Sequence, residues 1–204
     1  MGGHESDRPI LLTTEKSESA AAAEQIYQIT QTHIGTGIST QREAPEIACG
    51  LPVSRAVYFE NKTKEQAYET YYTAILECVK AFDNFDVIGH LDYCKRYYPG
   101  EYTQGDHLIA QPLVEEIFRT LIAKGKGIEV NTSGFRHVSE MCMPHYDIIA
   151  LYRQMGGTRI TIGSDSHRDE TVGFRVDDTM AQLKQIGFTH ISTFEQRVET
   201  KLPL

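Results

Sequence analysis

The 204 residues suit one domain with a sizeable core, and a hydrophobic content of 40% with a charged content of 24% is ordinary for a soluble globular protein. The net charge of -8, without a basic stripe, excludes a nucleic-acid-binding surface but leaves room for a small anionic substrate. No apolar run reaches the roughly 20 residues of a membrane span, and neither a signal peptide nor a C-x-x-C pair is found, so we expect a cytoplasmic protein with reduced cysteines and no membrane partner.

The N-terminal quarter of the chain carries weak structural signals. An apolar patch at 10–12 predicts a short edge strand, and alternation over 26–30 predicts a strand that leads to His33. Residues 35–55 are rich in Gly, Pro and Ser and predict a long loop, which is a feature of functional or mobile segments.

Helix and strand patterns alternate through the rest of the chain. A capping box of Thr63 and Gln66 predicts the start of a helix with a wide apolar face. The expected elements that follow are a strand at 85–90, a helix at 107–124 that Pro112 could shorten at its start, a strand at 128–131, a helix at 146–155, a strand at 159–162, a helix at 176–186, a strand at 190–194 and a frayed tail at 195–204. This order predicts βαβ units, a parallel sheet and therefore the α/β class.

Several strands end on side chains that can bind metal. The β-branched run at 160–162 stops at a glycine and is followed by Asp165 and His167, the strand at 85–90 ends in His90, and a weaker strand leads to His33. Carboxyl ends of parallel strands meet at one edge of a sheet, and imidazole and carboxylate groups suit Zn, Mn or Fe. Each residue also has a simpler interpretation: a polar turn for Asp165 and His167, a capping histidine for His90 and a loop histidine for His33.

Positive charges follow the same strand ends. Lys95 and Arg96 come after the His90 strand, and Arg136 comes after the strand at 128–131. A guanidinium binds phosphate as a fork, and metal ions beside it could polarise a phosphoryl group and supply hydroxide. Each of these side chains alone would more often be solvated. The interpretation as a phosphate site therefore depends on their common position after the strand ends.

Four blocks of sequence together carry a resemblance to a known family. The blocks are YFENKTKEQAY at 58–68, FDVIGHLDY at 85–93, GIEVNTSGFR at 127–136 and TIGSDSH at 161–167. In this order they resemble the histidinol-phosphatases of the PHP (polymerase and histidinol phosphatase) family. The motif G-S-D-x-H alone would fit several metal hydrolases, whereas the I-G-H-L-D and N-T-S-G-x-R blocks narrow the resemblance to this branch.

The resemblance implies a partial or distorted (β/α)7 TIM-like barrel of the PHP type, with up to three divalent metal ions at the carboxyl ends of the strands. His90, Asp165 and His167 match metal ligands of the family, and His33 resembles a strand-end histidine. Arg136 matches the position expected to hold the substrate phosphate, and Lys95 or Arg96 is a looser match. The implied reaction is hydrolysis of L-histidinol phosphate to L-histidinol and phosphate in histidine biosynthesis.

The N-terminal region departs from the family pattern. Residues 1–32 contain no His-x-His strand and no recognisable bridging glutamate, and the chain is about 60 residues shorter than a closed barrel would need. We therefore expect one PHP-like domain over 1–204, atypical or truncated over 1–40 and matching the family over 57–194, with fewer than three metals. An open barrel leaves an unpaired strand edge, which invites a homo-oligomer.

Three functions remain open from the sequence. The first is a metal-dependent phosphatase in which Asp165, His167 and Arg136 are catalytic and the substrate is histidinol phosphate. The second is a truncated, non-catalytic relative that keeps a residual metal or phosphate site and acts as a binding or dimerising module. The third is hydrolysis of another small phosphate ester.

Overall fold

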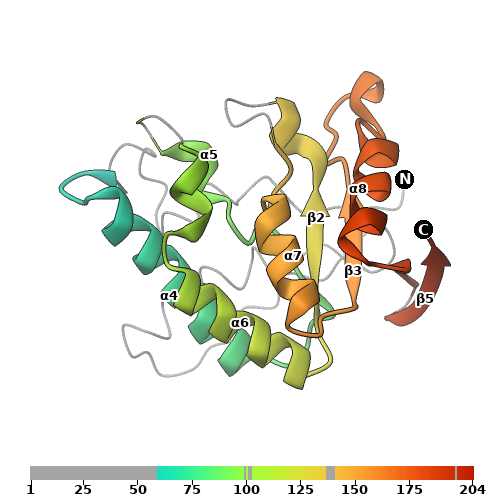
Figure 1. Ribbon diagram of the computed structural model, residues 1–204, viewed down its shortest axis with the longest axis horizontal. Helices are drawn as coiled ribbons and strands as arrows, with labels where there is room; N and C mark the ends of the chain where they lie inside the picture. The colour runs from blue at the N-terminus through green and yellow to red at the C-terminus, as the bar shows by residue number, and fades with distance from the viewer. Residues whose placement is uncertain (1–58, 99, 101–102, 137–140, 196) are drawn as a thin grey trace, which may run out of the picture.

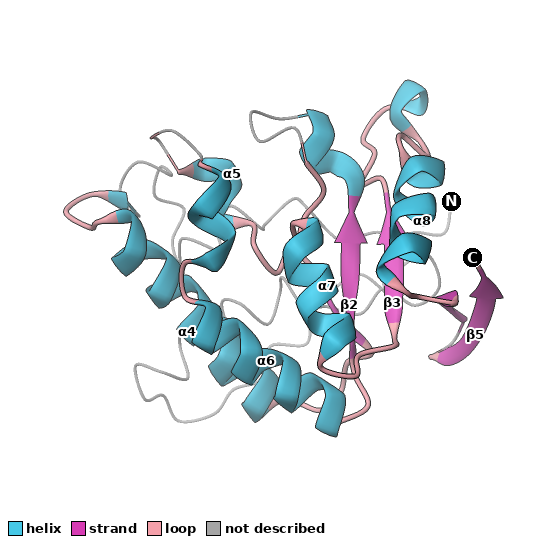
Figure 2. Ribbon diagram, in the orientation of Figure 1, coloured by secondary structure: helices cyan, strands magenta, loops and turns pink. Residues whose placement is uncertain are grey.

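The computed structural model describes residues 59–98, 100, 103–136, 141–195 and 197–204. They form an α/β arrangement with a parallel sheet, flanking helices and a hairpin near the C-terminal end (Figures 1 and 2). The helices are α4 (Lys64–Ala81), α5 (Cys94–Tyr97), α6 (Gln111–Ala123), α7 (Tyr146–Gln154) and α8 (Val176–Ile186). The strands are β1 (Val87–Ile88), β2 (Gly127–Asn131), β3 (Ile160–Gly163), β4 (His190–Glu195) and β5 (Val198–Pro203), and short 3₁₀ turns lie at η1 (Gln104–Leu108), η2 (Thr132–Arg136) and η3 (Asp169–Thr171).

The sheet consists of β1, β2 and β3 in sequence order, and all its pairs are parallel. Ile128 pairs with Ile160, and Asn131 pairs with Gly163 at the end of β3. Since the strands run in one direction, the segments that follow β1, β2 and β3 all leave from the same edge. The sheet therefore gathers the residues after Ile88, Asn131 and Gly163 into one region.

The two faces of β2 differ in polarity. Ile128 and Val130 are fully buried in the hydrophobic core, which also contains residues of α7 and α8, the helices that run alongside β2 and β3 (Figure 2). Side chains alternate between faces along a strand, so Glu129 and Asn131 point to the opposite face, and both are buried. Glu129 pairs in register with Thr161 of β3. The second face of the sheet is therefore polar.

Helix α4 begins with the predicted capping box. The Thr63 hydroxyl accepts a hydrogen bond from the Gln66 backbone N–H at 3.2 Å, and the Gln66 side chain accepts one from the Thr63 N–H at 2.9 Å. The buried face of α4 is dominated by aromatic and aliphatic side chains and packs against α6. Its largest fully buried members are Tyr68, Tyr71, Tyr72 and Ile75.

The structure changes several predicted boundaries. The helix expected at 107–124 begins at Gln111, because the preceding residues form η1 and Pro112 occupies the first turn. The short helix α5 lies between the strand expected at 85–90 and the helix expected at 107–124, where no element was predicted. The prediction of a frayed tail at 195–204 is wrong, since β5 pairs antiparallel with β4.

The prediction of unpaired cysteines is confirmed for the described residues, and other predictions concern residues outside them. Cys78, Cys94 and Cys142 are free and buried, as expected for reduced thiols, whereas Cys49 lies outside the described residues. The expected strands at 10–12 and 26–30 and the loop at 35–55 also lie outside them. Within the described part of the chain, the strands do not close into a barrel, and no helix is long and apolar enough to cross a bilayer.

The capping box yields a stability prediction. Thr63→Ala should lower the free energy of unfolding by about 1 kcal/mol, because the substitution leaves a backbone N–H of the first turn without its acceptor. Urea unfolding monitored by circular dichroism would measure the change. Thr73→Ala, at an exposed position in the middle of the same helix, is the matched control and should cost nothing. Equal losses in both variants would contradict the capping role.

Candidate active site at the carboxyl ends of the parallel strands

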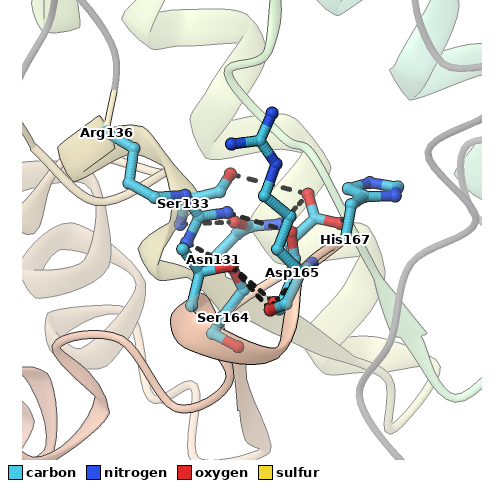
Figure 3. A network of polar contacts seen from close by, with 9 residues as sticks. Asn131, Ser133, Arg136, Ser164, Asp165 and His167 are labelled. Carbon is cyan, nitrogen blue, oxygen red and sulfur yellow. Dashed lines mark hydrogen bonds and ion pairs between the residues drawn. The ribbon is translucent and has the colours of Figure 1, made fainter.

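Asp165 is the buried carboxylate of the candidate site. It lies two residues after the end of β3, and only 5% of its surface is exposed (Figure 3). Its backbone is left-handed, with φ of 49°. Left-handed backbone is uncommon for residues other than glycine and concentrates at functional sites, where the surrounding structure enforces it. The conformation turns the chain sharply after the strand and keeps the carboxylate at the strand end.

Asn131, at the end of β2, holds the Asp165 carboxylate from the neighbouring strand. The Asn131 side-chain N–H donates to Asp165 Oδ2 at 3.0 Å, and its side-chain oxygen accepts the backbone N–H of Ser133 at 2.9 Å. The Ser133 hydroxyl makes a longer contact of 3.5 Å with the same carboxylate oxygen. Asn131 therefore connects the ends of β2 and β3 and fixes the orientation of Asp165.

Arg136 fixes the backbone on the other side of Asp165. Its two terminal nitrogens donate to the carbonyl oxygens of Ser164 and Asp165, each at 3.0 Å, and its guanidinium lies 5.7 Å from the centre of the Phe174 ring. The fork of the guanidinium thus spans two consecutive carbonyl groups. This contact places a positive charge beside the site and braces the loop after β3.

His167 completes the network at its exposed side. Its Nε2 lies 3.8 Å from Asp165 Oδ1, and its side chain is 60% exposed, whereas that of Asp165 is 3% exposed. The buried carboxylate and the exposed imidazole therefore form a pair that faces solvent through the histidine (Figure 3).

His90 lies at the end of the neighbouring strand β1. It is buried and also has a left-handed backbone, with φ of 53°. Its carbonyl oxygen accepts a hydrogen bond of 2.7 Å from the Tyr71 hydroxyl, and its ring lies 4.5 Å from that of Tyr93. Helix α4 therefore supports the turn that presents His90.

Glu129 is a site residue that the sequence analysis missed. Its carboxyl group accepts hydrogen bonds from the backbone N–H of His90 and from the Asn131 side chain. Burial, reinforced by the negative charge of Asp165, raises the pKa of Glu129 to about 8. Among the described residues, its Oε2 has no hydrogen-bond partner. The available signal was a charged residue inside the apolar strand run Ile128-Glu129-Val130.

The remaining predicted residues are placed differently. Lys95 is buried and forms an ion pair of 2.9 Å with Asp92, whose same oxygen also accepts the His145 N–H at 3.1 Å. Asp92 is therefore engaged with Lys95 and the His145 backbone. Arg96 lies on α5, and His33 lies outside the described residues.

The structure thus brings the residues after β2 and β3 into one network and links it to His90 through Glu129. Carboxylate and imidazole groups are the donor types that divalent metals of the Zn, Mn and Fe class prefer. Within the described residues, however, no three histidine, cysteine or acidic side chains converge closely enough to hold an ion. The described residues therefore supply suitable types of donor but not a complete set of ligands for one metal ion.

Comparison with a protein-family model gives a match over part of the chain. Residues 37–133 match the PHP domain family, a span that includes His90, Glu129 and Asn131 and ends before Asp165. The histidinol-phosphatase of Lactococcus lactis subsp. lactis (strain IL1403) is 32% identical over 139 residues, which cover 67% of this chain and 51% of that protein. The probable histidinol-phosphatase of Thermotoga maritima is 30% identical over 147 residues, covering 70% of this chain and 58% of that protein.

A solved structure gives the same result. The crystal structure of the histidinol phosphate phosphatase from Lactococcus lactis, complexed with Zn, L-histidinol and phosphate, superposes with a TM-score of 0.60 at 31% identity and covers 71% of this chain and 54% of that one. The chain spans about half the length of the curated relatives it matches. The predicted resemblance to histidinol-phosphatases of the PHP family is confirmed.

The raised pKa of Glu129 yields a test of the site. As pH rises above the ordinary glutamate range, the unfolded chain loses this proton while the folded chain keeps it up to about pH 8. The contribution to folding is therefore complete at acidic pH and lost as pH rises through about 8. Urea unfolding of metal-free protein between acidic and alkaline pH should show a weaker decline for Glu129→Gln than for the parent.

Glu69→Gln provides the control for this measurement, because Glu69 is exposed on α4. Its stability should follow the parent at every pH. Identical pH profiles for Glu129→Gln and the parent would show that Glu129 keeps an ordinary carboxyl environment.

Proposed function

We propose that this chain is a metal-dependent phosphomonoester hydrolase of the histidinol-phosphatase type, which converts L-histidinol phosphate and water to L-histidinol and phosphate in histidine biosynthesis. The observation that carries the proposal is the buried Asp165, held by Asn131 and Arg136 at the carboxyl ends of parallel strands. The similarity to a Lactococcus lactis enzyme whose crystal structure contains Zn, L-histidinol and phosphate supports this substrate class.

His90, Asp165 and His167 are the proposed metal ligands and His33 is a further one, although the three described side chains do not by themselves converge on a single ion. A divalent ion bound there supplies positive charge against the phosphoryl oxygens and activates water. Asn131 and Glu129 orient the ligands: Asn131 donates to the Asp165 carboxylate, and Glu129 accepts the His90 N–H. Such supporting groups are a normal part of metal sites.

Arg136 provides the positive charge for the substrate phosphate. Its guanidinium donates to the Ser164 and Asp165 carbonyl oxygens, which holds its positive charge beside the Asp165 carboxylate, and the planar fork of a guanidinium suits a phosphate group. Arg96 is proposed as an additional phosphate contact. Lys95 is the weaker candidate because its ammonium group is buried against Asp92.

For the chain as a whole, we propose one PHP-type domain over 1–204 with a partial or distorted (β/α)7 barrel, located in the cytoplasm. The parallel order β1-β2-β3 and the likeness to the Lactococcus lactis structure support this architecture.

A second candidate function is a non-catalytic relative with a residual metal or phosphate site. The described residues favour it in one respect, because they contain no convergent set of three ligands. Metal content distinguishes it from the enzyme: the enzyme should retain two or more divalent ions per chain, whereas the residual module should retain less than one. A third outcome, turnover of other phosphate esters with histidinol phosphate inactive, would assign a different substrate.

Asp165→Asn tests the enzyme directly. Phosphate release from L-histidinol phosphate with added Mn or Zn should fall by more than about 100-fold, because even residues that only orient metal ligands cost 10- to 100-fold. The matched control is Asp169→Asn, an exposed acid in η3 close in sequence, which should keep full activity. An inactive parent with sub-stoichiometric metal would contradict the enzyme and favour the residual module.

Asn131→Ala tests the support of Asp165. Loss of the hydrogen bond to the carboxylate should weaken metal affinity by about 10- to 100-fold in isothermal titration calorimetry. Gln154→Ala, which removes an exposed amide on α7, should leave affinity unchanged. Equal affinities for both variants would mean that Asn131 stabilises the fold without orienting a ligand.

A further inference from the structure

The outer edge of β5 is unpaired within the described part of the chain. β5 pairs with β4 along its whole length, from Val198 opposite Glu195 to Pro203 opposite His190. Its other edge pairs with none of the described strands, and β5 lies at the margin of the molecule, at the right of Figure 1. Every residue of β5 except Glu199 is exposed. Backbone N–H and C=O groups on such an edge are a template for another strand.

The register of the hairpin identifies which groups point outward. Leu204 N–H donates to the Thr189 carbonyl oxygen at 3.0 Å, one step beyond the pair of His190 and Pro203. Antiparallel pairs alternate between bonded and non-bonded, so Val198, Thr200 and Leu202 bond towards β4. The backbone groups of Glu199, Lys201 and Pro203 therefore point outward. Pro203 has no N–H to donate, which fits a position that β4 does not use.

The edge is complementary to itself in one antiparallel register. With a two-fold axis at Thr200, Glu199 lies opposite Lys201 of a second copy, and Val198 lies opposite Leu202 of that copy. The first pair places opposite side-chain charges next to each other, at positions where the outward backbone groups of the two strands can form hydrogen bonds. The second covers two of the large exposed apolar side chains, which are 67% and 44% exposed. Axes at Glu199 or Lys201 would instead place like charges opposite each other, which is unfavourable.

We propose that β5 pairs with β5 of a second copy of this chain in this register, so that the two hairpins form one four-stranded antiparallel sheet. Arg159 and Ser192 fix the position of the Glu199 carboxylate, at 2.8 Å and 2.6 Å, and 19% of the Glu199 side chain stays exposed for a further contact. An edge of six residues is small beside the roughly 800 Å² per partner of a stable interface, so the dimer is weak and concentration-dependent.

Sedimentation velocity of the full chain from micromolar to millimolar concentration tests the association. The parent should shift from monomer to dimer, and Lys201→Glu should raise the dissociation constant by at least about tenfold, because two opposite-charge pairs become like-charge pairs. Lys184→Glu makes the same charge change at an exposed position of α8 and should dimerise like the parent. A parent that stays monomeric throughout, or a Lys201→Glu variant with unchanged association, overturns the proposal.

A cysteine at the axis tests the register. In the proposed dimer Thr200 faces Thr200 of the second copy in a non-bonded pair, with Cα atoms about 4.5 Å apart, a separation that a disulfide can span. Thr200→Cys should therefore form a disulfide-linked dimer on mild oxidation, much faster than Lys184→Cys. Equal rates for the two variants would overturn this register.

Discussion

The parallel register of β1, β2 and β3 is the constraint on which the site depends. It brings Asn131 level with Gly163, so that the amide of one strand reaches the carboxylate two residues after the next. It also places Glu129 where it accepts the His90 N–H from the end of β1. A shift of one residue between strands would move these side chains to the apolar face of the sheet, so the hydrophobic core and the polar network enforce the same alignment.

The backbone conformation and the buried charges of the site cost free energy, and contacts with neighbouring segments compensate for that cost. His90 and Asp165 both have left-handed backbone, at a cost of about 1–3 kcal/mol each, and the Glu129 and Asp165 carboxyl groups are buried close together. The compensation comes from packed neighbours. The tyrosine-rich face of α4 holds the His90 turn through Tyr71, and Arg136 spans the carbonyl groups around Asp165. The positions of the site residues therefore depend on the stable packing of α4 and of the segment that carries Arg136.

Local patterns in the sequence predicted the helix and strand order because their physical causes are local. The Thr63 capping box, the apolar face of α4 and the glycines before His90 and Asp165 act within a few residues. The environment of Glu129 and the burial of the Lys95–Asp92 pair against His145 depend on packing between segments far apart in the chain, which composition and periodicity do not reveal. Most residues of β5 are polar and exposed, so its sequence resembles a tail although it pairs with the preceding strand. The metal and phosphate roles of His90, Asp165, His167 and Arg136 stay predictions, as does that of His33.

The hairpin also limits how far this protein can assemble. β5 has a single edge to offer, because its other edge is paired with β4 along its whole length. When two β5 edges pair about a two-fold axis, each edge is fully paired with the other, and neither β5 edge can bind a third chain. Assembly through β5 is therefore closed, in contrast to the head-to-tail strand pairing that grows into fibres.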